Sequence, residues 1–153
     1  MWQKLIRTDN AATPAILRLM LGIIFFAHGA QKTLGWWGGT TFSETMRLFT
    51  FNGVPAVLAF LAIAAEFLGG IGLILGLLGR VAAFGIACNM LVAIIVVHRH
   101  NGFFMNWTGG KGGEGFEYHL LALAMLASIM VAGSGALSVD RALSGVQTST
   151  TKK

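Results

Sequence analysis

The sequence contains few charged residues for its length. Asp, Glu, Lys and Arg make up 11% of its 153 residues, whereas a soluble domain carries about 25%. Hydrophobic residues make up 55%, and the mean hydropathy is +0.71. This composition excludes an ordinary soluble domain and indicates an integral membrane protein whose main partner is the lipid bilayer. The net charge of +5 does not indicate nucleic acid binding, because the basic residues are scattered at the ends of apolar runs.

The sequence also lacks the residues that common metal and nucleotide sites need. Cys88 is the single cysteine, so no disulfide can form within the chain. His98 and His100 have no third ligand at a suitable spacing, and we therefore expect no metal site. The glycine-rich stretch 109–115 does not end in the Gly-Lys-Ser/Thr of a phosphate-binding loop.

What the sequence does have is long apolar runs, which predict an all-α integral membrane fold. We expect an antiparallel four-helix bundle at 14–137, with spans at about 14–34, 54–78, 81–97 and 117–137. Residues 1–13 form a polar, basic N-terminal segment. The Ser- and Thr-rich residues 138–153 are expected to form a flexible tail.

A short helix is expected between the first two spans, over about 42–51. Thr41 and Glu44 have the spacing of a capping box, which starts a helix. Phe42, Met46 and Phe49 then share one face, so we expect this helix to lie on the membrane interface or to cover a cavity.

The distribution of basic residues predicts the orientation. Four spans put both termini on the same side of the membrane. With the termini inside, seven Lys and Arg residues lie in inner segments and four in outer segments. Both termini of this multi-pass protein are therefore expected in the cytoplasm, with the bundle in the plasma (inner) membrane. Arg18, near the start of the first span, is expected to extend to the lipid headgroups.

Glu66 is the one carboxylate in the middle of an apolar run. An ionisable group at this depth costs roughly 2.5–3.5 kcal/mol, so it normally faces the protein interior or a wet cavity. The residues that share its side of the helix are small, which lets another helix approach: Ala59, Ala62, Gly69 and Gly70. We therefore expect Glu66 to point into the bundle, as a structural acid that joins helices or as a functional acid.

Polar residues also gather near the end of the first span. His28, Gln31 and Lys32 share one side of that helix. At 1.5 Å per residue, His28 lies about 9 Å below the outer surface, where we expect it to face a cavity, whereas Lys32 suits the interface. Trp36 and Trp37 follow and suit the membrane–water boundary.

The third and fourth spans add polar groups at similar depth. Asn89 lies in a small-residue stripe, about 12 Å from the outer end of its span at the same rise. Glu117 and Tyr118 begin the fourth span at its outer mouth, whereas His119 is expected to face the interface. One polar cavity in the outer half of the bundle, lined also by Glu66, accounts for these positions. Separate structural roles are the alternative: Asn89 as a link between helices, and Glu117 in the favourable first turn of its helix.

Three motifs together resemble the DoxX family of small four-helix membrane proteins: His28-Gly29-x-x-Lys32-x-x-Gly35-Trp36, Glu66-Phe67-x-Gly69-Gly70 and Gly113-x-Gly115-Phe116-Glu117-Tyr118. The likeness covers about residues 12–137. The family name comes from a quinone-linked thiosulfate oxidoreductase of archaea, and many bacterial members are described as oxidoreductases. The resemblance therefore implies the four-helix fold and quinone-linked activity. The chain has no haem, flavin or iron–sulfur motif, so electron transfer requires a bound quinone or a redox partner subunit.

The leading hypothesis is a quinone-linked membrane oxidoreductase, or a membrane subunit of one. Under this hypothesis Glu66, His28 and Glu117 transfer protons. The residues expected to bind the substrate or quinone are Gln31, Lys32, Trp36, Trp37, Asn89 and Tyr118. Two alternatives use the same residues: a small-molecule binding or transport protein, and a non-catalytic subunit that stabilises a partner complex. The small-residue stripes would also allow a homodimer.

Overall fold

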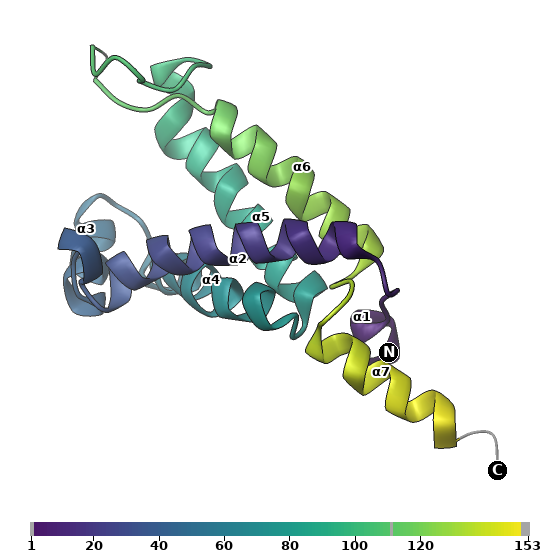
Figure 1. Ribbon diagram of the computed structural model, residues 1–153. Helices are drawn as coiled ribbons and strands as arrows, with labels where there is room; N and C mark the ends of the chain where they lie inside the picture. The colour runs from purple at the N-terminus through teal and green to yellow at the C-terminus, as the bar shows by residue number, and fades with distance from the viewer. Residues whose placement is uncertain (1, 111, 151–153) are drawn as a thin grey trace.

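The structure is a computed structural model that describes residues 2–110 and 112–150 (Figure 1). Its long helices are α2 (Ala12–Thr33), α4 (Ala56–Leu75), α5 (Gly79–Ala93) and α6 (Glu117–Ala132). The shorter elements are α1 (Trp2–Ile6), η1 (Trp36–Gly38), α3 (Phe42–Phe51), the π-helix η2 (Ile94–His98), η3 (Arg99–Asn101) and α7 (Val139–Thr150). Over the described ranges the chain contains no strand, only an isolated bridge between Leu34 and Thr41. The predicted all-helical fold is confirmed.

Within the described residues, three helical stretches are long and apolar enough to cross a membrane: Ala12–Thr33, Ala56–Leu75 and Gly79–Asn101. The third comprises α5, η2 and η3, so it extends further than the predicted 81–97. The helix α6 is apolar but shorter, with 16 residues. It ends at Ala132 rather than at 137, because Gly133 adopts a φ of +88° that leaves the helix.

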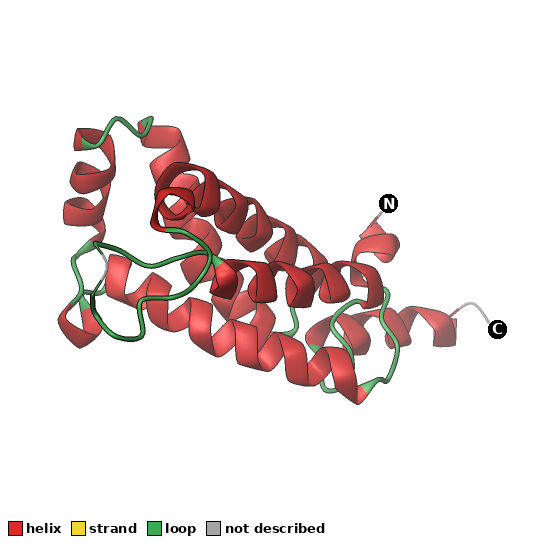
Figure 2. Ribbon diagram, turned by 90° about the horizontal axis from the view of Figure 1, so that it is seen from above, coloured by secondary structure: helices red, strands yellow, loops and turns green. Residues whose placement is uncertain are grey.

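The four long helices form two antiparallel pairs. The helix α2 packs along α4, α5 packs on both α4 and α6, and α6 also contacts α2. In Figure 1 the pair α2/α4 and the pair α5/α6 converge beside α1 and α7 and diverge toward α3 and the loop 102–116, and Figure 2 shows from above that helices joined by loops make up the described chain. We call the first end the terminal end and the second the open end.

The pair α2/α4 is held together by backbone contact at glycines. A Cβ on Gly29 would lie 2.5 Å from the Cα of Phe67, and a Cβ on Gly70 would lie 2.5 Å from the backbone nitrogen of Phe26. Only glycine permits so close an approach, which is the usual role of small residues between membrane helices. This approach determines where the polar side chains of α2 meet α4.

The apolar core lies between the two pairs. It comprises Leu21, Phe25, Leu73, Ala83, Ile86, Ala87, Met90, Ala122, Leu126 and Ile129. Large apolar side chains on the outer faces of the same helices are exposed, as expected where lipid is the solvent: Ile23, Phe60, Leu68, Phe84 and Leu121 are each more than half exposed.

Arg18 lies inside the terminal end, which corrects the expectation that it extends to the headgroups. Its side chain is 1% exposed. The guanidinium donates hydrogen bonds of 2.6–3.1 Å to five backbone carbonyls, those of Leu73, Ile74, Ser134, Ala136 and Leu137. The first two belong to the last turn of α4, where carbonyls lack helical partners and a cation is favoured by the helix dipole.

The segment after α6 is also fixed at the terminal end. The carboxylate of Asp140 accepts hydrogen bonds from the backbone N–H groups of Leu78 and Gly79, at 2.7 and 2.9 Å, and from the hydroxyl of Ser134 at 2.6 Å. It therefore caps the start of α5. The expectation of a flexible tail from 138 does not describe its first residues, because Asp140 is buried and Val139–Thr150 is helical. Residues 151–153 of that tail lie outside the described residues.

Candidate functional site

Glu66 lies inside the protein, as its small-residue neighbours predicted. The side chain is on α4 and the residue is 5% exposed. One carboxylate oxygen, Oε2, accepts a hydrogen bond from Nζ of Lys32 at 2.5 Å. The other, Oε1, accepts one from the side-chain amide nitrogen of Asn89 at 2.9 Å. Both oxygens therefore have a donor, which a buried carboxylate requires. We call Lys32, Glu66 and Asn89 the Glu66 cluster.

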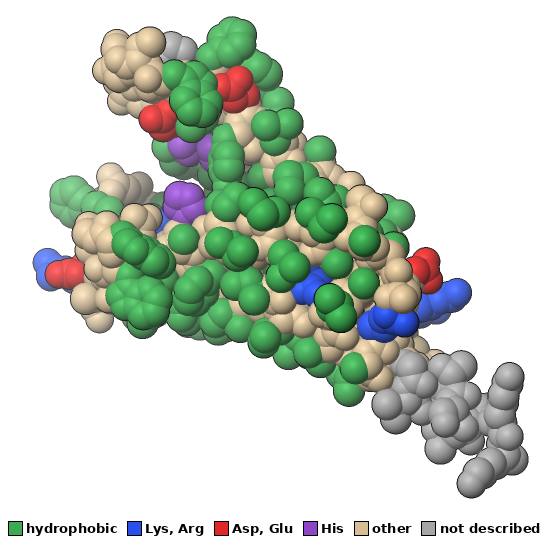
Figure 3. All heavy atoms as spheres, in the orientation of Figure 1, with side chains coloured by type: hydrophobic (Ala, Val, Ile, Leu, Met, Phe, Trp, Pro, Cys, Tyr) green, Lys and Arg blue, Asp and Glu red, His purple; other side chains and the backbone are tan. Residues whose placement is uncertain are grey.

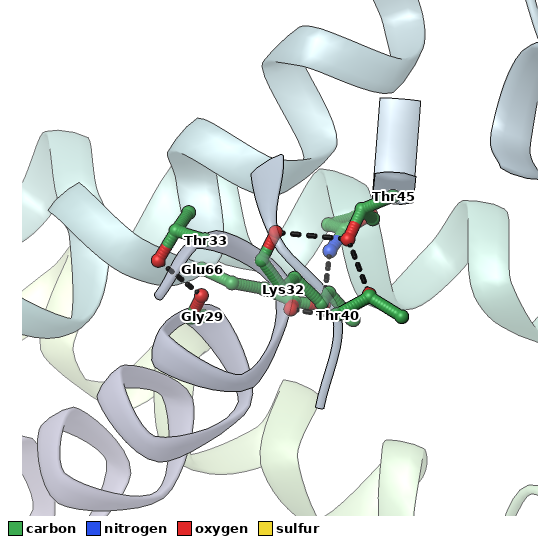
Figure 4. A network of polar contacts seen from close by, with 7 residues as sticks. Gly29, Lys32, Thr33, Thr40, Thr45 and Glu66 are labelled. Carbon is green, nitrogen blue, oxygen red and sulfur yellow. Dashed lines mark hydrogen bonds and ion pairs between the residues drawn. The ribbon is translucent and has the colours of Figure 1, made fainter. Parts of the chain in front are cut away.

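Lys32 reaches Glu66 because of the local structure around it. The close contact at Gly29 brings the last turn of α2 against α4. The Oγ1 atom of Thr45, on α3, donates to the backbone carbonyl of Lys32 at 2.9 Å and lies 2.7 Å from Oγ1 of Thr40 (Figure 4). The side chain of Lys32 is 32% exposed, so it joins the buried carboxylate to the protein surface. Lys32 was expected at the membrane interface, which describes its exposed part but not its ion pair with Glu66.

The cluster joins three helices, since Lys32 is on α2, Glu66 on α4 and Asn89 on α5. A fourth helix, α6, contributes Tyr118. The hydroxyl of Tyr118 is buried and has no hydrogen-bond partner in the described part of the chain. The helix α6 packs against α5, which carries Asn89 of the cluster. An unpartnered buried hydroxyl is a donor available to a ligand or to water.

His28 does not join the cluster. The residue is exposed, whereas Gly29 and Ala30 beside it are buried. Among the described residues, the contacts of Glu66 come from Lys32 and Asn89, and His28 makes no hydrogen bond or ion pair to it. In Figure 3 a notch separates the two helix pairs at the open end, and histidine side chains lie on both of its walls.

Glu117 is engaged by the loop 102–116. Its Oε1 atom accepts the backbone N–H of Met105 at 2.9 Å and the indole N–H of Trp107 at 3.3 Å. The neighbouring Glu114 accepts the backbone N–H of Asn106 at 2.7 Å. The two carboxylates therefore fix the loop over the start of α6.

The other predicted binding residues lie at the end of α2. Trp36 and Trp37 are exposed and contact each other edge to face, with ring centroids 5.5 Å apart. Trp36 also contacts Phe26, which stacks on Phe67 of α4. Gln31 is half-buried on the last turn of α2.

His119 is a buried polar residue of α6. It was expected at the interface, but it is 6% exposed and its ring centroid lies 4.1 Å from that of His98. The buried face of α6 is formed by His119, Ala122, Leu126 and Ile129. Their helical spacing is the signal in the sequence that indicates this face, whereas the expected cavity position of Glu117 indicates a different one. Leu121, four residues after Glu117 and therefore on the same side of the helix, is 68% exposed.

Two further observations limit the chemistry. Within the described residues no group of three or more His, Cys, Asp or Glu side chains is placed to hold a metal ion. A shallow hollow of about 610 Å³ lies against α3 and is lined by Glu44, Arg47, Leu48, Thr50 and Phe51. It contains none of the predicted site residues, and the Glu66 cluster is the better candidate because its polar groups are buried.

Comparison with known proteins gives a consistent result. The family model for DoxX matches residues 13–99. The chain is 31% identical over 125 residues to "Putative oxidoreductase CatD" of Bacillus subtilis, covering 82% of each chain. It is 28% identical to "Inner membrane protein YqjF" of Escherichia coli, covering 84% of this chain and 89% of the relative. It is 27% identical to "Uncharacterized membrane protein Rv3486" of Mycobacterium tuberculosis, covering 94% and 88%. No solved structure matches the chain.

Proposed function

Because the chain belongs to the DoxX family, we propose that it is a quinone-linked membrane oxidoreductase, or the membrane subunit of one. The name of the Bacillus subtilis relative supports the oxidoreductase class. The observation that carries the proposal is the Glu66 cluster, a buried carboxylate that holds Lys32 and Asn89 from two other helices, together with the buried, unpartnered hydroxyl of Tyr118. Ionisable groups inside a membrane protein are costly and are usually functional.

The residues around the cluster fit a quinone head, which is an apolar ring with two carbonyl acceptors. Tyr118 offers a buried O–H donor. The aromatic rings of Phe26, Trp36 and Phe67 offer apolar contact at the end of α2. Few polar groups on apolar walls are typical of small-molecule sites. A bound quinone would supply two-electron, two-proton redox chemistry.

The chain's own residues have separate tasks in this proposal. Glu66 takes up and releases a proton, Lys32 compensates the charge of its carboxylate, and Asn89 orients it. His28 and Glu117, the other predicted proton-transfer residues, lie nearer to water. Gln31, Trp36 and Trp37, at the end of α2 and in η1, are the remaining residues proposed to bind the substrate or quinone.

We also propose that both termini lie in the cytoplasm and the open end faces outward. The excess of basic residues in the segments that would then be inside supports this orientation. Thr150→Cys and Gly112→Cys in intact cells test it with a membrane-impermeant thiol reagent, in a Cys88→Ala background. Labelling should occur at 112 and not at 150, and the reverse pattern would overturn the orientation.

One observation favours a second candidate, a scaffold subunit without chemistry. Both carboxylate oxygens of Glu66 already have donors, as in a structural ion pair that joins helices. The two candidates differ in one respect: the scaffold needs no ligand at Tyr118.

Quinone binding separates them. The full chain is purified in lipid nanodiscs and titrated with decylubiquinone and with menadione, following tryptophan fluorescence. Saturable binding is expected, and Tyr118→Phe should weaken it about 3–10-fold, the loss of one hydrogen bond. Ser128→Ala is the matched control, because it removes an exposed hydroxyl from the same helix. If neither quinone binds saturably, the scaffold candidate replaces the oxidoreductase.

A further inference from the structure

His119 and His98 form a pair of imidazoles that the proposed function does not use. Their ring centroids are 4.1 Å apart with an angle of 43° between the rings, which places the rings in van der Waals contact. His119 is 6% exposed, and its Nδ1 atom is buried without a hydrogen-bond partner among the described residues. A buried ring nitrogen without a hydrogen-bond partner destabilises the fold, so its position calls for an explanation.

One side of the pair leads to water. His98 ends the π-helix η2 and is half-buried. Its Nδ1 atom lies 2.9 Å from the backbone carbonyl of Glu114, in the loop at the open end. The next residues of the chain, Arg99 and His100, are exposed. His98 therefore stands between the buried imidazole and the surface.

The other side of the pair leads to the Glu66 cluster. The rings of His119 and Tyr118 meet edge to face, with centroids 5.5 Å apart. The hydroxyl of Tyr118 is the second buried side-chain polar atom without a partner among the described residues, and its helix packs against α5, which carries Asn89 of the Glu66 cluster. The two unpartnered atoms thus belong to adjacent residues, between a buried carboxylate and a half-buried histidine.

Glu117 is the other residue that could carry a proton to the surface, but its carboxylate is already hydrogen-bonded. Glu117 is nearer to the mouth in the sequence, but its Oε1 atom already accepts two hydrogen bonds from the loop 102–116. Transfer through Glu117 would have to break these contacts. Neither Nδ1 of His119 nor the hydroxyl of Tyr118 has such a contact to lose.

We propose that Tyr118, His119 and His98 form the path along which protons pass between Glu66 and water at the open end. A proton from water binds Nε2 of His98, and the same nitrogen releases it toward His119, while the Nδ1–H group keeps its hydrogen bond to the carbonyl of Glu114. His119 accepts it on one nitrogen and releases one from the other, and Tyr118 passes one proton on from its hydroxyl to the Glu66 carboxylate. Each relay group accepts one proton and gives one away, so only Glu66 changes its charge, and the reverse sequence releases a proton. Bridging waters or ring rotation make the hydrogen bonds between neighbours.

The charged groups around the path are consistent with this direction. Lys32 and Asn89 hold Glu66, and Lys32 remains as the positive charge when the carboxylate is neutral. The loop carbonyl of Glu114 holds His98. The path rests on the proposed function only for the use of the proton, since it delivers protons to Glu66 whether or not a quinone is bound.

The test therefore follows protonation of Glu66 without turnover. The full chain in nanodiscs is mixed rapidly into acidic buffer, and the infrared band of the protonated carboxyl is recorded over time. The band that disappears in Glu66→Gln identifies the residue. His119→Phe should slow its appearance at least tenfold, and added imidazole should restore part of the rate. His119→Gln, which keeps the polar shape but cannot relay a proton in the same way, covers the case in which the Phe variant does not fold.

His100→Gln and Glu44→Gln are the matched controls, because each changes an exposed titratable group at the open end that lies outside the path. Both should protonate Glu66 at the wild-type rate. A slow rate in either control with a normal rate in His119→Gln would assign the route to that residue and overturn the proposal. If Glu66 is protonated at the same rate in all variants, the histidine pair is structural and the proposed path is wrong. Failure of quinone binding would refute the proposed function alone, because no quinone enters this measurement.

Discussion

Replacement of Arg18 tests whether a buried cation holds the terminal end together. Its guanidinium donates to five carbonyls, two at the end of α4 and three in the segment between α6 and α7. Arg18→Met keeps an unbranched apolar stem of similar length but removes every donor. The carbonyls then lose their partners at a place where the side chain is 1% exposed to solvent.

The magnitude follows from the number and kind of bonds. Hydrogen bonds from a charged group contribute about 1.5–3 kcal/mol each, but these five share one desolvation penalty and do not add. Removing one partner of a buried charged network costs about 3–5 kcal/mol, which is our expectation for Arg18→Met. At about 2–4 °C per kcal/mol for a chain of this size, Tm should fall by about 6–20 °C.

The assay is thermal unfolding of the full chain in one detergent, followed by circular dichroism. Arg47→Met is the matched control, because Arg47 is exposed on α3, and its free energy of unfolding should change by less than about 0.5 kcal/mol. Arg18→Lys keeps the positive charge but not the planar set of five N–H donors, so its free energy of unfolding should fall by an intermediate amount. If Arg18→Met unfolds at the same temperature as Arg47→Met, the buried network does not stabilise the fold and the reasoning is wrong.

Three further predictions address other contacts. Gly29→Leu should separate α2 from α4, because even a Cβ at this position meets the backbone of Phe67. The yield of a disulfide crosslink between cysteines placed on the two helices should therefore fall. Glu66→Gln should fold like the wild type, whereas Glu66→Leu should lose roughly 1–3 kcal/mol by leaving Asn89 and Lys32 unpaired, as thermal unfolding would reveal. The hydrogen bond from the Thr41 side chain lowers the pKa of Glu44 below 4.5. The stabilisation of α3 by this cap is therefore complete above that pH and is lost as pH falls through the lowered pKa, and Glu44→Gln should abolish this pH dependence of the Thr41 amide NMR shift.

The position of Glu66 could be predicted from the sequence, and that of Lys32 could not. One charge among small residues on one face of a helix indicates that this face is buried. The direction of a long side chain such as Lys32 depends on how closely two helices approach, which Gly29 and Phe67 determine together. The capping box at Thr41 and Glu44 was predictable because it is local, and the structure contains it.

The polar contacts of the terminal end depend on residues far apart in the chain. The acceptors of Arg18 lie 55 to 119 positions away, so no local pattern indicates them. The predicted inner face of α6 was wrong for a different reason. Its polar first turn suggested that Glu117 faces inward, but the loop 102–116 returns to satisfy that carboxylate. Sequence periodicity does not reveal a loop that supplies donors from outside the helix.

The unequal joining of the two helix pairs has a mechanical consequence. At the terminal end Arg18, Asp140 and Arg80 cross-link the pairs to the flanking segments through many hydrogen bonds, Arg80 reaching the carbonyls of Met130, Val131, Lys4 and Arg7. Toward the open end, the side-chain hydrogen bond between the pairs is the one from Asn89 to Glu66, within the described residues. Hydrogen bonds therefore hold the two helix pairs together more firmly at the terminal end than at the open end. A change in helix tilt, by which membrane proteins adapt to bilayer thickness, is therefore expected to change the separation of the pairs more at the open end than at the terminal end.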